Sequence, residues 1–432
     1  FEGRMPSALV AADRRAEDHL GGAILRSGES RQPLRVAAHR IALGAAVRDA
    51  CVAYTVELRW AVEKSWRDLA LRVGDAVLVS PQLWLWYPEA GGSDVEVRFD
   101  LPPGVSVSTP WAPLSEGTEP RAFRTGARPR DWDAKIAIGR FENVALDVPG
   151  ATLGVALLEG LPPADRGAVL EWVHANALAI TTAYGQFPVK RVQVLAVPVG
   201  RAREPVPWGQ VMRGGGDAVH VYIDQTRSLQ TFMNDWVLVH ELSHLLHPYV
   251  ESSGRWLYEG LASYYQNLLR ARTGRLSEQA AWEKLHAGFR RGIRGTKPQQ
   301  SLLEASEAML RERGFMRVYW SGAAIALLAD VELRRRSGGE QSLDRALAAL
   351  SGCCLPSARQ WSDRELMRRL DALSGSDVFM NLYRRYVHAD DFPDLTEAYR
   401  RLGLRATGDR TLQLEGDTAA QALRRGIMAV SQ

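Results

Sequence analysis

The chain has 432 residues, of which 46% are hydrophobic and 24% are charged, with a formal net charge of +4. This composition is typical of a globular protein of roughly two or three domains. No apolar run is close to the length of a membrane-spanning helix, which needs about 20 residues. The basic residues are not clustered into a tract of the kind that binds nucleic acid. The cysteines, Cys51, Cys353 and Cys354, show no disulfide framework. A bridge from Cys51 to either of the others stays open.

The N-terminal part of the chain is predicted to be β-structure. Residues 1 to about 35 mix charged residues with Gly and Ser, so we expect the start to be poorly ordered. From 50 to about 157 the pattern is one of short strands, with apolar residues alternating over 52–60 and again over 83–87. Several short strands at regular spacing favour a β-sandwich-like domain over residues 1–160.

The next segment mixes helix and strand. We expect a helix over 164–184, strands over 191–197 and 219–224, and a loop over 205–216. The strand over 219–224 alternates cleanly, and such a strand can pair with an extended peptide; an ordinary sheet strand is the equal alternative. The rest of the chain is predicted to be helical over 228–247, 256–272, 276–291, 301–311, 317–336 and, with short loops, to about 402.

One segment of the helix over 228–247 carries chemistry, namely His240-Glu241-Leu242-Ser243-His244. Two histidines four residues apart lie on one face of a helix, so both imidazoles can bind one metal ion. Glu241 lies beside the first and can take a proton from an attacking water. The alternative is a pair of core histidines. Because the surrounding apolar residues recur at helical spacing, the helix is largely buried, and a metal supplies the partners that buried histidines need.

A third ligand is predicted fifteen residues beyond His244. Glu259 lies between apolar and aromatic neighbours, where a carboxylate needs a cation. The alternative is a glutamate on a helix surface, which is common and has no functional role. Two histidines, one glutamate and an open position are typical of a catalytic zinc site and not of a structural one. We therefore expect one Zn²⁺ per chain, bound by His240, His244 and Glu259.

Tyr319 is the next candidate. It lies near the start of the helix over 317–336, among small residues that allow close packing. Hydrolysis of an amide builds negative charge on the carbonyl oxygen, which zinc and a phenolic donor can share. A core tyrosine is the alternative, and the residues alone support both equally.

The stretch from Trp256 to Tyr264, following His-Glu-x-x-His, resembles the gluzincin metallopeptidases. These include the aminopeptidase N family and, more closely, the glycyl aminopeptidase family. Those families carry an oxyanion-binding tyrosine in a Tyr-x-x-Gly context, and Tyr319-Trp320-Ser321-Gly322 stands at the matching separation. The likeness covers about residues 160–400. It implies a thermolysin-like zinc domain over 161–300, followed by a mostly helical region over 301–432 that contributes Tyr319.

Two departures from those families concern specificity. The interval from His244 to Glu259 is shorter than in aminopeptidase N relatives. The Gly-x-Met-Glu-Asn segment that binds a free amino terminus there is absent; in the comparable region, 210–217, only Asp217 offers a carboxylate. Exopeptidase and endopeptidase action therefore both stay open.

Together these features predict an α+β multidomain zinc-dependent peptidase, with Glu241 and Tyr319 catalytic. The expected partner is a peptide or protein substrate, without nucleic acid or a membrane span; the oligomeric state stays open. Two alternatives are a catalytically silent zinc-binding scaffold and a zinc hydrolase acting on a non-peptide substrate such as an epoxide. A scaffold needs neither Glu241 nor Tyr319. The chain opens with Phe1, which either a removed signal segment or trimming would explain. The compartment therefore stays open, with a periplasmic or secreted location slightly favoured over a cytoplasmic one.

Overall fold

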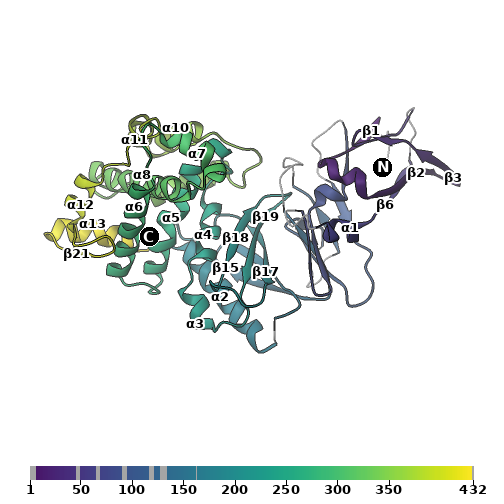
Figure 1. Cartoon of the computed structure of the whole chain (residues 1–432), viewed down its shortest axis with the longest axis horizontal. Helices are drawn as coiled ribbons and strands as arrows, with labels where there is room; N and C mark the ends of the chain where they lie inside the picture. The colour runs from purple at the N-terminus through teal and green to yellow at the C-terminus, as the bar shows by residue number, and fades with distance from the viewer. Residues whose placement is uncertain are drawn as a thin grey trace. The chain divides into compact units, whose positions relative to one another are not determined.

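The computed structural model describes residues 6–44, 49–64, 69–89, 95–115, 121–126, 134–161 and 163–430. Contacts divide the chain into two compact units. The first comprises Phe1–Leu146, Thr152–Gly167 and Arg191–Thr226, and the second Asp147–Ala151, Ala168–Lys190 and Arg227–Gln432. A mixed α/β multidomain organisation with a helical C-terminal part is therefore confirmed (Figure 1). The boundaries predicted near 160 and 300 differ from those of the two units and stay predictions.

Small antiparallel sheets make up the N-terminal part of the first unit. In the described residues their strand orders are β4-β5-β1-β9, β3-β2-β6, β11-β14-β8-β7 and β10-β13-β12. The first two sheets share a core that includes Leu9 and Leu25, and the last two share another that includes Val79 and Phe123. Each strand turns alternate apolar residues to one face, so sheets pack in pairs. The part of the chain that is described thus forms two packed pairs where one sandwich was predicted.

The elements of this part are short. They are β1 (Ala8–Ala11), η1 (Arg14–His19), β2 (Leu20–Ser27), β3 (Ser30–Leu34), β4 (Val36–Ala37), β5 (Arg40–Ala42), β6 (Cys51–Val56), α1 (Leu58–Glu63), β7 (Ala70–Val73), β8 (Ala76–Val79), η2 (Pro81–Leu83), β9 (Trp86–Pro88), β10 (Glu96–Arg98), β11 (Ser106–Ser108), β12 (Ala112–Pro113), β13 (Ala122–Arg124) and β14 (Ile136–Gly139).

Two expectations for this part differ from the structure. Residues 6–35, expected to be poorly ordered, contain β1, η1, β2 and β3, because Leu9 and Leu25 supply apolar side chains to a core. The strand expected over 52–60 ends at Val56 and helix α1 begins at Leu58. Ala61 follows Leu58 at helical spacing and is fully buried, so burial of one helix face outweighs the apparent alternation.

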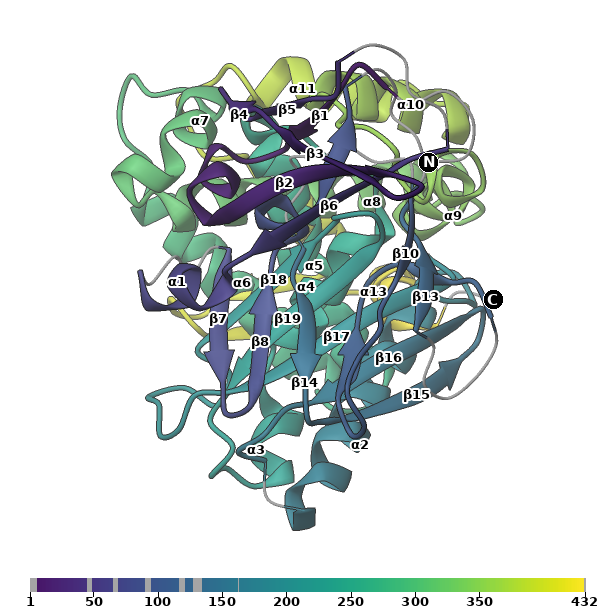
Figure 2. The same ribbon diagram turned by 90° about the vertical axis from the view of Figure 1, so that its right-hand side faces the viewer.

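A five-stranded sheet lies next in the chain, in the order β15-β16-β17-β19-β18. Figure 2 shows its strands side by side. The central strands β16, β17 and β19 run parallel. The nearly continuous burial of β17 and β19 is typical of such strands. The bounds are β15 (Glu142–Val148), β16 (Ala151–Leu157), β17 (Arg191–Pro198), β18 (Trp208–Met212) and β19 (Asp217–Ile223).

This sheet corrects one interpretation of the sequence. Strand β19, considered above for pairing with a peptide, is hydrogen-bonded on both sides, to β17 and to β18. Its backbone groups are therefore already paired. The edge strand next to β19 is β18. It lies inside the stretch 205–216 that was predicted to be a loop, because the surrounding prolines and glycines resemble a loop signal.

Helices make up most of the rest of the chain. The predicted helices over 256–272, 276–291, 301–311 and 317–336 all occur, with ends shifted by a few residues. In the described residues, no helix combines the length and the apolar composition needed to cross a membrane. The bounds are α2 (Pro163–Thr181), α5 (Arg255–Arg272), α6 (Glu278–Arg294), α7 (Leu302–Glu312), α8 (Phe315–Arg336), α9 (Leu343–Cys354), α10 (Asp363–Ser374), α11 (Val378–Tyr386), α12 (Thr396–Leu402), β20 (Leu404–Ala406), β21 (Leu412–Leu414) and α13 (Thr418–Met428).

The cysteines do not form the long-range bridge that the sequence left open. Cys353 and Cys354 are joined to each other at the end of α9, and Cys51 is free and exposed.

Candidate metal centre

The helix predicted over 228–247 is divided into three segments, namely α3 (Leu229–Asn234), α4 (Val237–Ser243) and the 3-10 turn η3 (His244–Leu246). Asp235 produces the first break. Its backbone is extended, and its carboxylate accepts a hydrogen bond from the backbone N–H of Val237 at 2.7 Å, so one aspartate ends α3 and binds the first backbone N–H of α4.

The second half of the motif is also bounded by local chemistry. His247 has an extended backbone directly before Pro248, a conformation that proline favours in the preceding residue. Between these two stops, α4 continues into η3 without an extended residue. His240 and His244 therefore stay one turn apart on the same face, as the spacing predicts.

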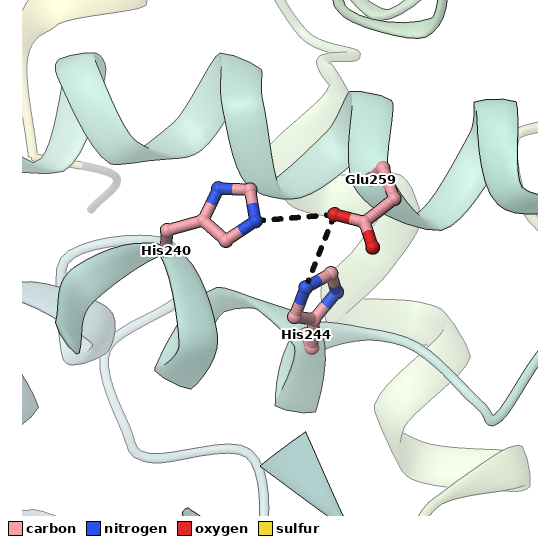
Figure 3. A group of neighbouring side chains, drawn as sticks. All are labelled: His240, His244 and Glu259. Atoms are coloured by element: carbon pink, nitrogen blue, oxygen red, sulfur yellow. Dashed lines mark hydrogen bonds and ion pairs between the residues drawn. The ribbon is translucent and has the colours of Figure 1, made fainter. Parts of the chain in front are cut away.

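The three predicted ligands come together in the second unit (Figure 3). Oε2 of Glu259, from α5, lies 3.2 Å from Nε2 of His240 and 3.6 Å from Nε2 of His244. One donor atom from each residue lies within 4.8 Å of the other two. Ligand distances of about 2.0–2.2 Å in a tetrahedral zinc site separate neighbouring ligand atoms by about 3.3–3.6 Å. The donor set and its spacing therefore fit a zinc ion.

Burial and charge also favour a cation at this point. The side chains of His240, His244 and Glu259 are only 4%, 5% and 12% exposed. Burial by itself would lower the pKa of His240, but the hydrogen bond to Glu259 and the charges of Glu241 and Glu259 outweigh it and raise that pKa. Because two carboxylates act on one buried imidazole, positive charge is stabilised there, and a proton and a metal ion compete for the same nitrogen.

Sequence reasoning missed Gln266, which orients the first histidine. Its Oε1 lies 2.8 Å from Nδ1 of His240, and the side chain is 7% exposed. An amide oxygen only accepts hydrogen bonds, so this contact assigns a ring proton to Nδ1 and leaves Nε2, which faces Glu259, as the nitrogen for which a proton and a metal ion compete. Gln266 follows Glu259 by seven residues, two helical turns on the same face of α5, and that spacing is the signal that could have found it.

We expect Gln266→Leu to weaken zinc binding by about 10–100-fold, because His240 then loses the partner that fixes its tautomer and ring orientation. Competition against a chromophoric chelator measures this affinity. Gln266→Glu is the matched control, since a carboxylate also accepts the Nδ1 proton, and it should bind zinc about as tightly as the parent. Equal affinities for the leucine variant and the parent would remove Gln266 from the centre.

The two predicted catalytic residues lie beside the ligands. The ring of Tyr319, from α8, stacks on the ring of His240 with centroids 6.0 Å apart and planes inclined by 12°. Burial, followed by the charges of Glu259 and Glu241, holds the pKa of Tyr319 well above its ordinary value, so its hydroxyl keeps its proton and can donate it in a hydrogen bond. Glu241 directly follows His240 in α4, and its negative charge contributes to raising the pKa of both His240 and Tyr319.

Two further residues complete the description. The ring of Tyr258, which the sequence did not single out, packs edge-on against His244 with centroids 5.7 Å apart. Asp217, the one carboxylate of the segment 210–217, lies in the first unit, 4% exposed, with Oδ1 3.6 Å from Nη1 of Arg213. An aspartate already paired with a buried arginine is poorly suited to bind an amino terminus.

No family model matches the chain, and no curated protein matches it. Solved structures do resemble it in fold. An aminopeptidase N family protein from Idiomarina loihiensis has a TM-score of 0.69 at 16% identity, over 97% of this chain and 78% of that one. An M1 zinc metallopeptidase from Deinococcus radiodurans has a TM-score of 0.52 at 15% identity, over 91% and 92%. A mutant of such an enzyme from the same organism, bound to the substrate Tyr-Ser-Ala, has a TM-score of 0.50. At these identities the likeness is one of fold.

Proposed function

We propose that this chain is a zinc-dependent peptidase of the gluzincin type, resembling the aminopeptidase N family and, more closely, the glycyl aminopeptidase family. The observation that carries the proposal is the donor spacing at His240, His244 and Glu259, which fits one zinc ion. The fold shared with zinc metallopeptidases supports it, as does the position of Glu241 and Tyr319 beside the donors.

In this proposal each residue has a distinct task. A bound zinc ion would lower the pKa of a water molecule to about 7 and polarise the scissile carbonyl. Glu241 accepts the proton of the attacking water and delivers it to the leaving amine. Tyr319, protonated at neutral pH, donates a hydrogen bond to the carbonyl oxygen as negative charge develops on it. Gln266 keeps His240 in the tautomer that binds the metal.

Two other functions use the same residues differently. A silent zinc-binding scaffold would need the three ligands but not a carboxylate and a protonated phenol next to them. A zinc hydrolase for a non-peptide substrate would need all five residues and differ only in substrate. The placement of Glu241 and Tyr319 favours an enzyme over a scaffold. The solved structures that share this fold are peptidases, which favours a peptide substrate.

The proposal is tested by incubating the zinc-loaded protein with a peptide mixture, half with free and half with acetylated amino termini, and identifying products by mass spectrometry. We expect hydrolysis of peptide bonds. Release of single residues from the free peptides alone would identify an aminopeptidase, and internal fragments from both halves an endopeptidase. A protein that holds one zinc per chain and leaves every peptide intact would contradict the proposal.

A further inference from the structure

Helices α5 and α8 touch backbone to backbone at one point, Gly260 and Gly322. A Cβ atom built on Gly260 would overlap Cα and the carbonyl carbon of Gly322 and lie 2.8 Å from the amide nitrogen of Ala323. A Cβ atom on Gly322 would overlap the carbonyl oxygen of Trp256 and lie 2.8 Å from Cα of Gly260. Packed helices usually keep their axes about 8–10 Å apart because side chains intervene. At this crossing no side chain fits at either position.

This crossing lies within one helical turn of two functional groups. Gly260 directly follows Glu259 in α5, and Gly322 follows Tyr319 by three residues in α8, which places both on the same side of that helix. The separation of the two helices at the glycines therefore determines how far the Glu259 carboxylate lies from the Tyr319 hydroxyl.

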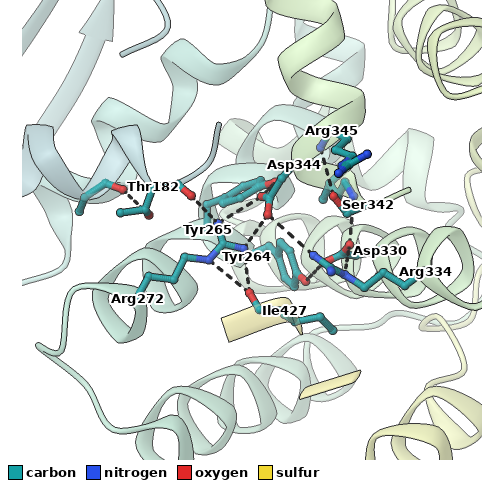
Figure 4. Close-up of polar contacts among 12 residues, drawn as sticks. Thr182, Tyr264, Tyr265, Arg272, Asp330, Arg334, Ser342, Asp344, Arg345 and Ile427 are labelled. Carbon is teal, nitrogen blue, oxygen red and sulfur yellow. Dashed lines mark hydrogen bonds and ion pairs between the residues drawn. The ribbon is translucent and has the colours of Figure 1, made fainter. Parts of the chain in front are cut away.

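A hydrogen bond holds the two helices in register beyond the glycines (Figure 4). The hydroxyl of Tyr264, one turn after Gly260, donates to Oδ2 of Asp330 at 2.9 Å. Oδ1 of Asp330 accepts from Nε of Arg334 at 2.9 Å and from the backbone N–H of Leu343 at 3.0 Å. Tyr264 and Asp330 are both at most 1% exposed. Because Asp330 is held from three directions, α5 and α8 cannot slide past one another without breaking a buried charged hydrogen bond.

The opposite side of α8 is also in close contact. A Cβ atom built on Gly288, in α6, would overlap the ring of Trp320, the residue directly after Tyr319. Phe289 packs against the same ring with centroids 6.1 Å apart. Helix α8 therefore lies tightly between α5 and α6, and an atom added at Gly260 cannot be accommodated by a simple retreat of α8.

We infer that Gly260 and Gly322 are positioning residues, which hold the metal ligand Glu259 and the oxyanion donor Tyr319 at their working separation, with Tyr264 and Asp330 keeping the register. The part of this inference that concerns Tyr319 rests on the proposed function. The part that concerns the position of Glu259 does not depend on it. It predicts that a single methyl group at the crossing damages the metal centre without touching any ligand.

The test uses Gly260→Ala and Gly322→Ala in the full chain, loaded with cobalt(II) or zinc. We expect each variant to alter the visible absorption of bound cobalt, since Glu259 moves, and to bind zinc about 10–100-fold more weakly. We expect kcat on a cleaved peptide to fall by about 10²-fold with little change in KM, as a displacement of about 1 Å can do. The cobalt spectrum and zinc affinity need no turnover, so they decide this inference even if no peptide is cleaved.

Three further variants keep the test decisive. Gly352→Ala in α9, where an added Cβ meets nothing within 4 Å, should keep the parent spectrum. Leu370→Ala, a buried position in α10, should lower the melting temperature and also keep it. Tyr264→Phe adds no atom, and we expect it to shift the cobalt absorption and to weaken zinc binding several-fold. This variant decides the inference if neither glycine variant folds. A folded Gly260→Ala with parent absorption and affinity would overturn the inference, as would an unchanged Tyr264→Phe or an altered Leu370→Ala.

Discussion

Replacing Glu241 with glutamine is expected to lower kcat by a factor of about 10²–10⁴, the usual size of a general acid–base contribution. Glutamine is nearly isosteric but its amide cannot accept the proton of the attacking water. Glu241 is not among the residues whose donor atoms converge on the metal position, so the variant should still contain one zinc per chain. Steady-state kinetics on a cleaved peptide, together with elemental analysis of the same sample, measure both quantities.

The matched control for this change is Glu307→Gln, an exposed position on α7. It removes the same charge from an exposed residue that is not part of the candidate ligand group, and its kinetics should equal those of the parent. If Glu241→Gln retained both its zinc and near-normal turnover, Glu241 would have no part in proton transfer, and the base would have to be sought elsewhere.

Tyr319→Phe is expected to lower kcat by about 10²–10³-fold, or roughly 3–4 kcal/mol, with little change in KM. The reason is that the hydroxyl meets negative charge that exists only in the transition state, so binding of the ground state does not depend on it. The ring is retained, so its stacking on His240 and the packing of α8 should persist. Zinc content and melting temperature should therefore stay close to those of the parent.

A tyrosine whose hydroxyl has only a structural role would behave in the opposite way. Tyr399→Phe provides the comparison. Tyr399 lies in α12 of the same unit, and its hydroxyl is hydrogen-bonded to Nδ1 of the buried His286 at 2.9 Å. Its loss should lower the melting temperature and leave kcat unchanged. A Tyr319→Phe variant with that second pattern, intact catalysis and lowered stability, would return Tyr319 to a structural role.

The residues of the candidate metal centre could be predicted because the pattern that marks them is local. Two histidines one turn apart and a glutamate in an apolar context are visible in the sequence, and the structure brings all three together. Gln266 escaped prediction because a glutamine on a helix carries no signal until the histidine that it orients is known to lie opposite. The Gly260–Gly322 contact is likewise invisible, since it joins helices that are far apart in sequence.

The fold was harder to predict from the sequence, because much of it depends on contacts between residues that are far apart in the chain. Helices such as α5 and α8 follow an internal periodicity and were predicted to within a few residues. The pairing of strands depends on distant partners, so edge strand β18 was mistaken for a loop. The break at Asp235 was missed because one hydrogen bond from a backbone N–H to an aspartate side chain interrupts an otherwise apolar helical pattern.

The central claim is that one zinc ion, held by His240, His244 and Glu259, makes this chain a peptidase. It is tested most directly by removing the metal with a chelator and measuring peptide hydrolysis as zinc is added back. We predict no hydrolysis without metal, a linear rise to one equivalent of zinc per chain, and no recovery for His244→Ala at that zinc concentration. Hydrolysis that persists in the metal-free protein, or an equal response from His244→Ala, would contradict the claim.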